Sequence, residues 1–170
     1  ERAERLRDAL DGGALAVRPV VHRVDAPGIA RALAEPVHIF ASVHSVEGLI
    51  RYYRNDLAAG DIIMVNAPYF FGSHIPDWTV IKPVFYNNKP VFFPGIRAHM
   101  IEVGGPVAGC YNSDARDVWQ EGFRRAPIKL YERGELRRDM LDLLKANFRE
   151  DLGKDDWRLV IKLKKVFDII

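Results

Sequence analysis

The stretch Gly60–Tyr86, GDIIMVNAPYFFGSHIPDWTVIKPVFY, decides the expected architecture. Its opening run, Asp61–Asn66, is compact, apolar and too short for a helix, so it predicts a buried strand. From Thr79 to Tyr86 the content of β-branched and aromatic residues is high again, which favours a second extended segment. Between these segments Gly72 and Pro76 indicate a loop, because both residue types steer the backbone sharply. Strands are therefore expected in the middle of the chain.

Extended segments are also expected on both sides of this stretch. The turn formers Asn87 and Asn88 separate it from Val91–Phe93, which predicts a hairpin. Upstream, Ala14–Ser42 shows apolar alternation that is interrupted by Asp25–Gly28, a run of turn-forming residues. This pattern is typical of another hairpin.

Helical spacing of apolar residues is found towards both ends of the chain. It predicts a short opening helix over 3–10, a helix from Val46 that ends near Gly60, a short helix over 118–123 and a stronger one over 136–148. The tail 156–170 suits a helix or a strand, and a helix is preferred. With no internal repeat or linker, we expect one α+β unit over residues 1–170, a single domain or a fragment, with central strands and hairpins and flanking amphipathic helices.

The composition is that of an ordinary globular chain. It has 170 residues, 48% hydrophobic and 28% charged, and a net charge of +2, which gives no reason to expect a nucleic acid or an anionic membrane as partner. No apolar run approaches the roughly 20 residues that span a bilayer. The single cysteine, Cys110, cannot form an internal disulfide, which favours a reducing compartment. We therefore expect a soluble, cytoplasmic protein.

Two segments carry pairs of potential metal ligands. His74 is followed three residues later by Asp77, and His99 is followed three residues later by Glu102. If neighbouring strand ends bring these units together, they offer two nitrogens and up to two carboxylates, a set that suits Mn²⁺, Fe²⁺ or Zn²⁺. The alternative is that the spacing arises by chance and each histidine is structural.

Other chemical patterns are weaker. The glycine-rich Gly104–Gly109 lacks the ending of a phosphate-binding loop, so a turn is the better interpretation. Ser73 lacks the second glycine of a nucleophile elbow. Cys110 has no demonstrable base near it in the sequence, which favours a buried or incidental thiol. Arg97, near His99, suits either an anionic substrate or a structural ion pair.

Long blocks of the chain resemble the hydantoinase B family. They are residues 60–86, residues 97–150, which include YNSDARDVWQEGFRRAPIKLY, and the earlier EPVHIF. The resemblance covers about residues 26–150 and is nearest to the metal-bearing subunit of the acetone carboxylase branch. It implies that His74, Asp77 and His99 occupy metal-ligand positions, with manganese expected and zinc or iron as alternatives. Glu102 stands where the family commonly has Asp, so it is a possible extra ligand or supporting residue.

The resemblance also implies a function. That branch uses ATP to join a ketone to bicarbonate, forming a 3-oxo acid, and ATP is handled by a hydantoinase A-like partner among the other carboxylase subunits. Two alternatives remain open: ATP-dependent opening of a cyclic amide, as in hydantoinase and oxoprolinase relatives, and a non-catalytic assembly module. Family members are several times longer, so the chain is expected to be partial.

Overall fold

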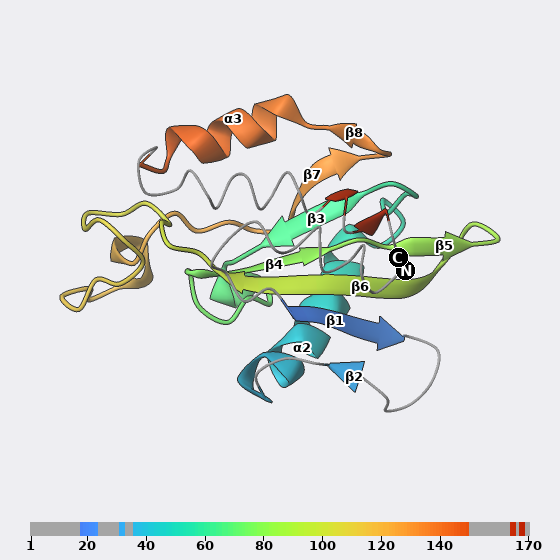
Figure 1. Cartoon of the computed structure of the whole chain (residues 1–170), viewed down its shortest axis with the longest axis horizontal. Coiled ribbons are helices and arrows are strands. Elements are labelled where there is room, and N and C mark those ends of the chain that lie inside the picture. The colour runs from blue at the N-terminus through green and yellow to red at the C-terminus, as the bar shows by residue number, and fades with distance from the viewer. Residues whose placement is uncertain (1–17, 24–30, 33–35, 150–163, 166, 169–170) are drawn as a thin grey trace.

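Figure 1 shows a computed structural model of the chain, which describes residues 18–23, 31–32, 36–149, 164–165 and 167–168. Within these residues eight strands form one sheet whose paired neighbours are all antiparallel, and helices cover both of its faces. The expected α+β fold class is therefore confirmed. Among the described residues, no helix combines the length and apolar content needed to cross a membrane.

The strands are β1 (Arg18–Arg23), β2 (Arg31–Ala32), β3 (Ile62–Val65), β4 (Asp77–Ile81), β5 (Val84–Tyr86), β6 (Lys89–His99), β7 (Ile128–Glu132) and β8 (Glu135–Leu136). The helices are α2 (Pro36–Tyr53) and α3 (Arg138–Ala146), with the 3-10 turns η1 (Pro68–Phe70) and η2 (Val118–Gln120). The sheet order is β2-β1-β6-β4-β3-β7-β8, and β5 pairs with β6 beside this path. The long β6 therefore lies near the centre of the sheet, next to β4.

Both predicted hairpins are present as strand pairs. β1 pairs with β2, with Val20 opposite Ala32, although the predicted turn over 25–28 and the opening helix over 3–10 lie outside the described residues. β5 pairs with β6, and Asn87 and Asn88 form the turn that connects them. Their φ values of 49° and 60° are the left-handed conformation that a tight hairpin turn requires. β6 continues well beyond the predicted Val91–Phe93 and carries its chain as far as His99.

The boundaries of α2 differ from the prediction. The helix begins at Pro36, in a segment predicted to be extended through Ser42, and it ends at Tyr53 rather than near Gly60. Proline fits the first turn of a helix, because the N–H that it lacks would have no partner inside the helix. The apolar alternation predicted β1 and β2 correctly, but over residues 36–42 it was a misleading signal for a strand.

Packing explains why α2 is stable in this position. Val46 and Leu49 are buried against Ile63 on one face of the sheet. A Cβ atom on Gly48 would lie 1.8 Å from the ring of Phe71, so this ring packs directly on the helix backbone. The segment after η1 is thereby held against α2.

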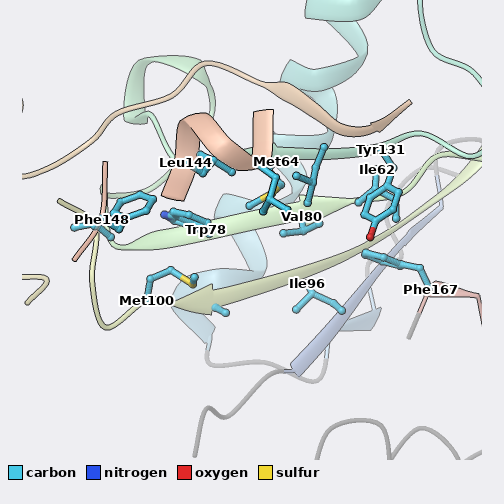
Figure 2. Packing of buried hydrophobic residues seen from close by; sticks show 14 of the residues in the cluster. Ile62, Met64, Trp78, Val80, Ile96, Met100, Tyr131, Leu144, Phe148 and Phe167 are labelled. Carbon is cyan, nitrogen blue, oxygen red and sulfur yellow. The ribbon is translucent and has the colours of Figure 1, made fainter. Parts of the chain in front are cut away.

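The opposite face of the sheet is covered by α3. Alternate residues of a strand point to opposite faces, so Ile62 and Met64 lie in one core while Ile63 lies in the other. Figure 2 shows the larger core, in which Leu144 of α3 packs over side chains of β3 and β4. Its labelled members are Ile62, Met64, Trp78, Val80, Ile96, Met100, Tyr131, Leu144, Phe148 and Phe167.

In the C-terminal third, one predicted helix is confirmed, one is wrong and one strand pair was not predicted. The helix predicted over 136–148 is α3. The predicted helix over 118–123 is only the short turn η2, and β7 with its partner β8 was not predicted. In the tail, residues 164–165 and 167 are helical, in agreement with the preferred interpretation, and the rest of 156–170 is outside the described residues apart from Asp168.

Candidate metal centre

A tight turn places the first two candidate ligands. The N–H of Asp77 donates to the carbonyl of His74 at 3.1 Å, so the two residues lie at the ends of one turn that leads into β4. Gly72, just before it, passes so close to the backbone that a Cβ atom there would lie 2.5 Å from the carbonyl oxygen of Asn66. Only glycine fits this approach. The segment is therefore shaped to present both side chains together.

The buried Asn66 fastens this turn to a distant part of the chain. Its Nδ2 donates to the carbonyls of Ile75 at 2.9 Å and Phe123 at 3.0 Å, and its Oδ1 accepts from the N–H of Arg125 at 2.8 Å. A side chain that satisfies three backbone groups in the interior is costly to move. The turn therefore has a fixed position relative to the rest of the sheet.

The register of β4 and β6 brings in the third candidate ligand. Asp77 is directly opposite His99, at the end of β6 that lies beside the start of β4 in Figure 1. Paired residues in an antiparallel sheet have their side chains on the same face. The two residues thus share the α2 face, whereas Trp78 and Ala98 beside them are buried in the core under α3.

The three side chains converge. His74 Nδ1 lies 3.2 Å from Asp77 Oδ2, and His99 Nδ1 lies 3.0 Å from Asp77 Oδ1. One ligand atom from each residue can be chosen so that all three lie within 4.8 Å of one another. The Asp77 side chain is 1% exposed, whereas those of His74 and His99 are 41% and 39% exposed. The group is therefore anchored in the interior and open to solution.

The spacing of these atoms suits a divalent cation. Bonds of about 2.1 Å to a metal ion place neighbouring ligand atoms about 3.0–3.4 Å apart. The two distances from Asp77 to the imidazoles fall in this range, which is also that of the hydrogen bonds they make without an ion. Two imidazoles and a carboxylate are a donor set for zinc, iron or manganese. Metal binding at these three residues stays a prediction.

Two further residues lie beside His99, and nothing in the sequence connected them with it. Cys110 Sγ lies 3.3 Å from His99 Nε2, and the ring of Tyr111 stacks on the His99 ring with centroids 5.5 Å apart. On its other side the His99 ring faces that of His74 at 5.3 Å. The sequence shows no base next to Cys110, but the ten residues 100–109 return its thiol to His99 at the end of β6.

Arg97 is two residues before His99 on β6, on the same face of the sheet as His74, Asp77 and His99, which we call the triad. It is buried, its Nε donates to Thr79 Oγ1 and its Nη2 donates to Ser45 Oγ of α2, both at 2.8 Å. Burial lowers the pKa of Arg97, and the negative charge of Asp77 opposes that shift. These contacts tie α2 to the sheet. The predicted role of Arg97 in substrate binding stays a prediction.

Glu102 is not one of the converging ligands. Its carboxylate is buried and accepts hydrogen bonds from the N–H groups of Gly104 at 2.6 Å and Gly109 at 3.1 Å. Arg149 Nη1 lies 3.1 Å from the same carboxylate, and its Nη2 donates to the carbonyl of Gly105. The glycine-rich loop therefore does surround an anion with backbone N–H groups, but that anion is the protein's own side chain.

Comparisons with known proteins agree with the sequence resemblance. The β subunit of caprolactamase from Pseudomonas jessenii is 37% identical over 114 residues, a match that covers 67% of this chain and 20% of the relative. 5-oxoprolinase 1 from Arabidopsis thaliana is 38% identical over 106 residues, which cover 62% of this chain and 8% of the relative. The chain thus spans a small part of the length of these relatives.

Two solved structures share the fold. The crystal structure of the ATP-dependent caprolactamase from Pseudomonas jessenii matches 95% of this chain and 31% of its own, with a TM-score of 0.75 and 26% identity. A nucleotide-free acetone carboxylase matches 99% of this chain and 23% of its own, with a TM-score of 0.75 and 14% identity, which shows a common fold. The profile of the family described as hydantoinase B/oxoprolinase matches residues 21–155. The chain belongs to the hydantoinase B/oxoprolinase family.

Proposed function

We propose that the chain supplies the divalent-metal centre of an ATP-dependent enzyme that opens cyclic amides. The observation that carries this proposal is the convergence of His74, Asp77 and His99 from one turn and two paired strands. Three protein ligands leave coordination positions for water or substrate, which is the arrangement of catalytic rather than structural metal sites. The half-exposed imidazoles give such a substrate access from solution.

Asp77 is the residue that would organise the metal centre. Asp77 is buried between the imidazoles, so it would hold its charge at a fixed point and orient both rings. Ser73 Oγ donates to Asp77 Oδ2 at 3.0 Å and restrains that carboxylate further. When bound, a divalent ion would polarise an amide carbonyl or a phosphorylated amide oxygen as a Lewis acid. Manganese remains the expected metal, with zinc or iron as alternatives.

The relatives favour cyclic amides as the substrate class. The chain is 37% identical to a caprolactamase subunit and 38% identical to a 5-oxoprolinase over the matched regions. The compounds in these two names, caprolactam and 5-oxoproline, are both cyclic amides. Carboxylation of a ketone with bicarbonate is the second candidate, because the block Tyr111–Tyr131 resembles the acetone carboxylase branch.

A partner subunit is part of the proposal. The caprolactamase relative is itself named a β subunit, and this sequence contains no phosphate-binding loop of the Walker type. We expect a hydantoinase A-like subunit to bind ATP and to activate the substrate, which then reaches the triad. A non-catalytic assembly module would contain the same fold without turnover in the presence of that partner.

Metal analysis of the purified chain tests the centre directly. We expect the chain to bind a divalent metal and His74→Ala and His99→Ala to lose most of it. The matched control is His44→Ala, since His44 is on α2, has a side chain 75% exposed and lies outside the triad. If both triad variants keep the metal content of the unmodified chain, the metal centre is wrongly assigned.

Turnover then separates the two reactions. The chain, combined with its nucleotide-binding partner, ATP and metal, is incubated with a lactam or hydantoin, and in parallel with acetone and bicarbonate. Ring opening of the cyclic amide supports the proposal, whereas formation of a 3-oxo acid supports the second candidate. Metal binding without turnover of either substrate would favour the assembly module.

A further inference from the structure

Both ring nitrogens of His99 have a protein partner, one on each side of the imidazole. Nδ1 lies 3.0 Å from Asp77 Oδ1, and Nε2 lies 3.3 Å from Cys110 Sγ. A neutral imidazole has one protonated nitrogen, which donates, and one bare nitrogen, which accepts or binds a metal. The partner on one side therefore influences which nitrogen is available on the other.

The cation site proposed above lies on the Nδ1 side of this ring. Asp77 is there, and its second oxygen lies 3.2 Å from His74 Nδ1. In the described part of the chain, the group of mutually close ligand atoms contains His74, Asp77 and His99 but not Cys110. The sulfur is thus beside the ring of His99 and away from the point where the three ligands meet.

We propose that Cys110 is a positioning residue for this centre, and this inference rests on the metal centre of the proposed function. When a cation takes the place at Nδ1 of the proton that the Asp77 carboxylate otherwise accepts, the ring proton lies on Nε2 and is donated to the sulfur of Cys110. His99 therefore binds the cation through Nδ1. A metal-binding histidine usually donates its other N–H to an acceptor that orients the ring, and here sulfur takes that place.

The surrounding loop holds the sulfur in position. Gly109, the neighbour of Cys110, donates its N–H to the buried Glu102 and has a φ of +96°, which glycine adopts without strain. Tyr111, the neighbour on the other side, stacks on the His99 ring at an interplanar angle of 28°. Contacts on both sides of Cys110 therefore fix the loop relative to the ring that the sulfur contacts.

Nitrogen-15 NMR of the zinc-loaded chain reads the assignment directly. Long-range couplings between ring protons and ring nitrogens distinguish Nδ1 from Nε2 and a protonated from a metal-bound nitrogen. We expect His99 to show a protonated Nε2 and a metal-bound Nδ1. Zinc bound to Nε2 would overturn the proposal.

Substitution of the sulfur gives a second readout. We expect Cys110→Ala to weaken Zn²⁺ binding about tenfold, the lower end of the effect of losing an orienting partner. Cys110→Ser should recover most of the affinity, because its hydroxyl accepts the same hydrogen bond. The matched control, Ser113→Ala, changes an exposed residue of the same loop and should bind as the unmodified chain does. Calorimetric titration measures all four proteins, and circular dichroism verifies their fold.

The outcomes of these experiments distinguish the role of Cys110 from the proposed metal centre on which it rests. An unmodified chain that binds no zinc overturns both proposals. If it binds zinc and Cys110→Ala binds equally well, the metal centre stands and the role of Cys110 is refuted. A sulfur-to-cobalt charge-transfer band in the Co²⁺-loaded chain would make Cys110 a direct ligand, which also refutes the positioning role.

Discussion

Two buried aspartates near opposite ends of the β3–β4 pair show how differently the fold uses a carboxylate. Asp61 comes just before β3 and Asp77 begins β4, and the side chains of both are 1% exposed or less. Asp61 contacts the buried Lys129 at 3.1 Å, whereas Asp77 contacts the half-exposed His74 and His99. A buried acid therefore has a built-in cation at one end and two potential metal ligands at the other.

The surroundings of Asp61 satisfy its charge completely. Its two oxygens accept the N–H groups of Ala58 at 2.9 Å and Arg133 at 2.8 Å, in addition to the contact with Lys129. This network connects the start of β3 with β7, and it neutralises the carboxylate without a bound ligand. Asp77 differs because its partners are imidazoles, which bind metals through an uncharged nitrogen, so its charge can be matched by an ion from solution.

The largest expected effect is the loss of stability when Asp61, at the start of β3, is replaced. Asp61→Ala removes the carboxylate nearest to the buried Lys129 and the acceptor of two backbone N–H groups, so we expect a loss of about 3–5 kcal/mol in the free energy of unfolding. Denaturant unfolding in the presence of a chelator measures this. The control is Asp56→Ala, because Asp56 also contacts Lys129 but its side chain is 75% exposed. A loss no greater than that of the control would contradict the comparison.

Glu102 provides a third buried carboxylate, intermediate between the two. Glu102→Gln leaves one oxygen for the N–H groups of Gly104 and Gly109, so we expect the unfolding free energy to fall by about 1.5–3 kcal/mol. The exposed Glu121→Gln is the matched control. Unfolding by urea compares the two variants, and equal stabilities would show that the loop does not depend on this anion.

Arg125 is a buried cation for which no hydrogen-bond partner of the guanidinium is found among the described residues, and it lies 4.0 Å over the ring of Trp78. Burial lowers its pKa to about 9, so between pH 9 and its ordinary value the folded state binds fewer protons than the unfolded state. Stability of the unmodified chain therefore rises with pH in that range. We expect Arg125→Met to add about 1–2 kcal/mol at neutral pH, after the lost ring contact is considered.

Urea unfolding at pH 7 and pH 10 tests this expectation, and the advantage of Arg125→Met should shrink at the higher pH. Arg124→Met is the control, because Arg124 stacks on the exposed Tyr69 and Trp119 instead. A variant of Arg125 that is less stable at both pH values would show that the ring contact outweighs the burial of charge.

The smallest effect on stability is expected when Asp77, at the start of β4, is replaced. In a chelator, Asp77→Asn should lower the unfolding free energy by about 1 kcal/mol, because the amide keeps one oxygen as an acceptor while the buried Arg97 loses a nearby negative charge. Added Mn²⁺ at a hundred times its dissociation constant should stabilise the unmodified chain by about 2.7 kcal/mol but leave the variant unchanged. Thermal shifts with and without Mn²⁺ measure both values. An equal shift for the two proteins would place the ion elsewhere.

Residues with strong local signals made much of the fold predictable. The run Asp61–Asn66 became β3, and the pair Asn87–Asn88 formed the hairpin turn, because Asn tolerates positive φ better than most residues. β7 and β8 were missed because their turn uses Arg133 and Gly134 at φ values of 51° and 91°. Arginine is an uncommon residue for that conformation, so only the glycine remained as a signal.

The candidate site was predictable as far as local spacing reaches. The pairs His74–Asp77 and His99–Glu102 are each visible in four consecutive residues, and the family resemblance selected His74, Asp77 and His99 as the ligand positions. The sequence could not reveal that Glu102 is a buried anion held by the glycine-rich loop, because its partly exposed partner Arg149 is 47 residues away. Nor could it place Cys110 beside His99, since that contact depends on how Glu102 folds the loop.

The division of the triad between strands and a turn has a practical consequence for protein engineering. Asp77 and His99 belong to paired strands whose other side chains build the core, so both are difficult to relocate. The segments 68–73 and 111–121 lie outside the strands and expose Tyr69, Tyr111 and Trp119. A mutant library restricted to these three exposed side chains would diversify the surroundings of the predicted metal centre while leaving Phe71, Gly72 and the framework of the sheet intact.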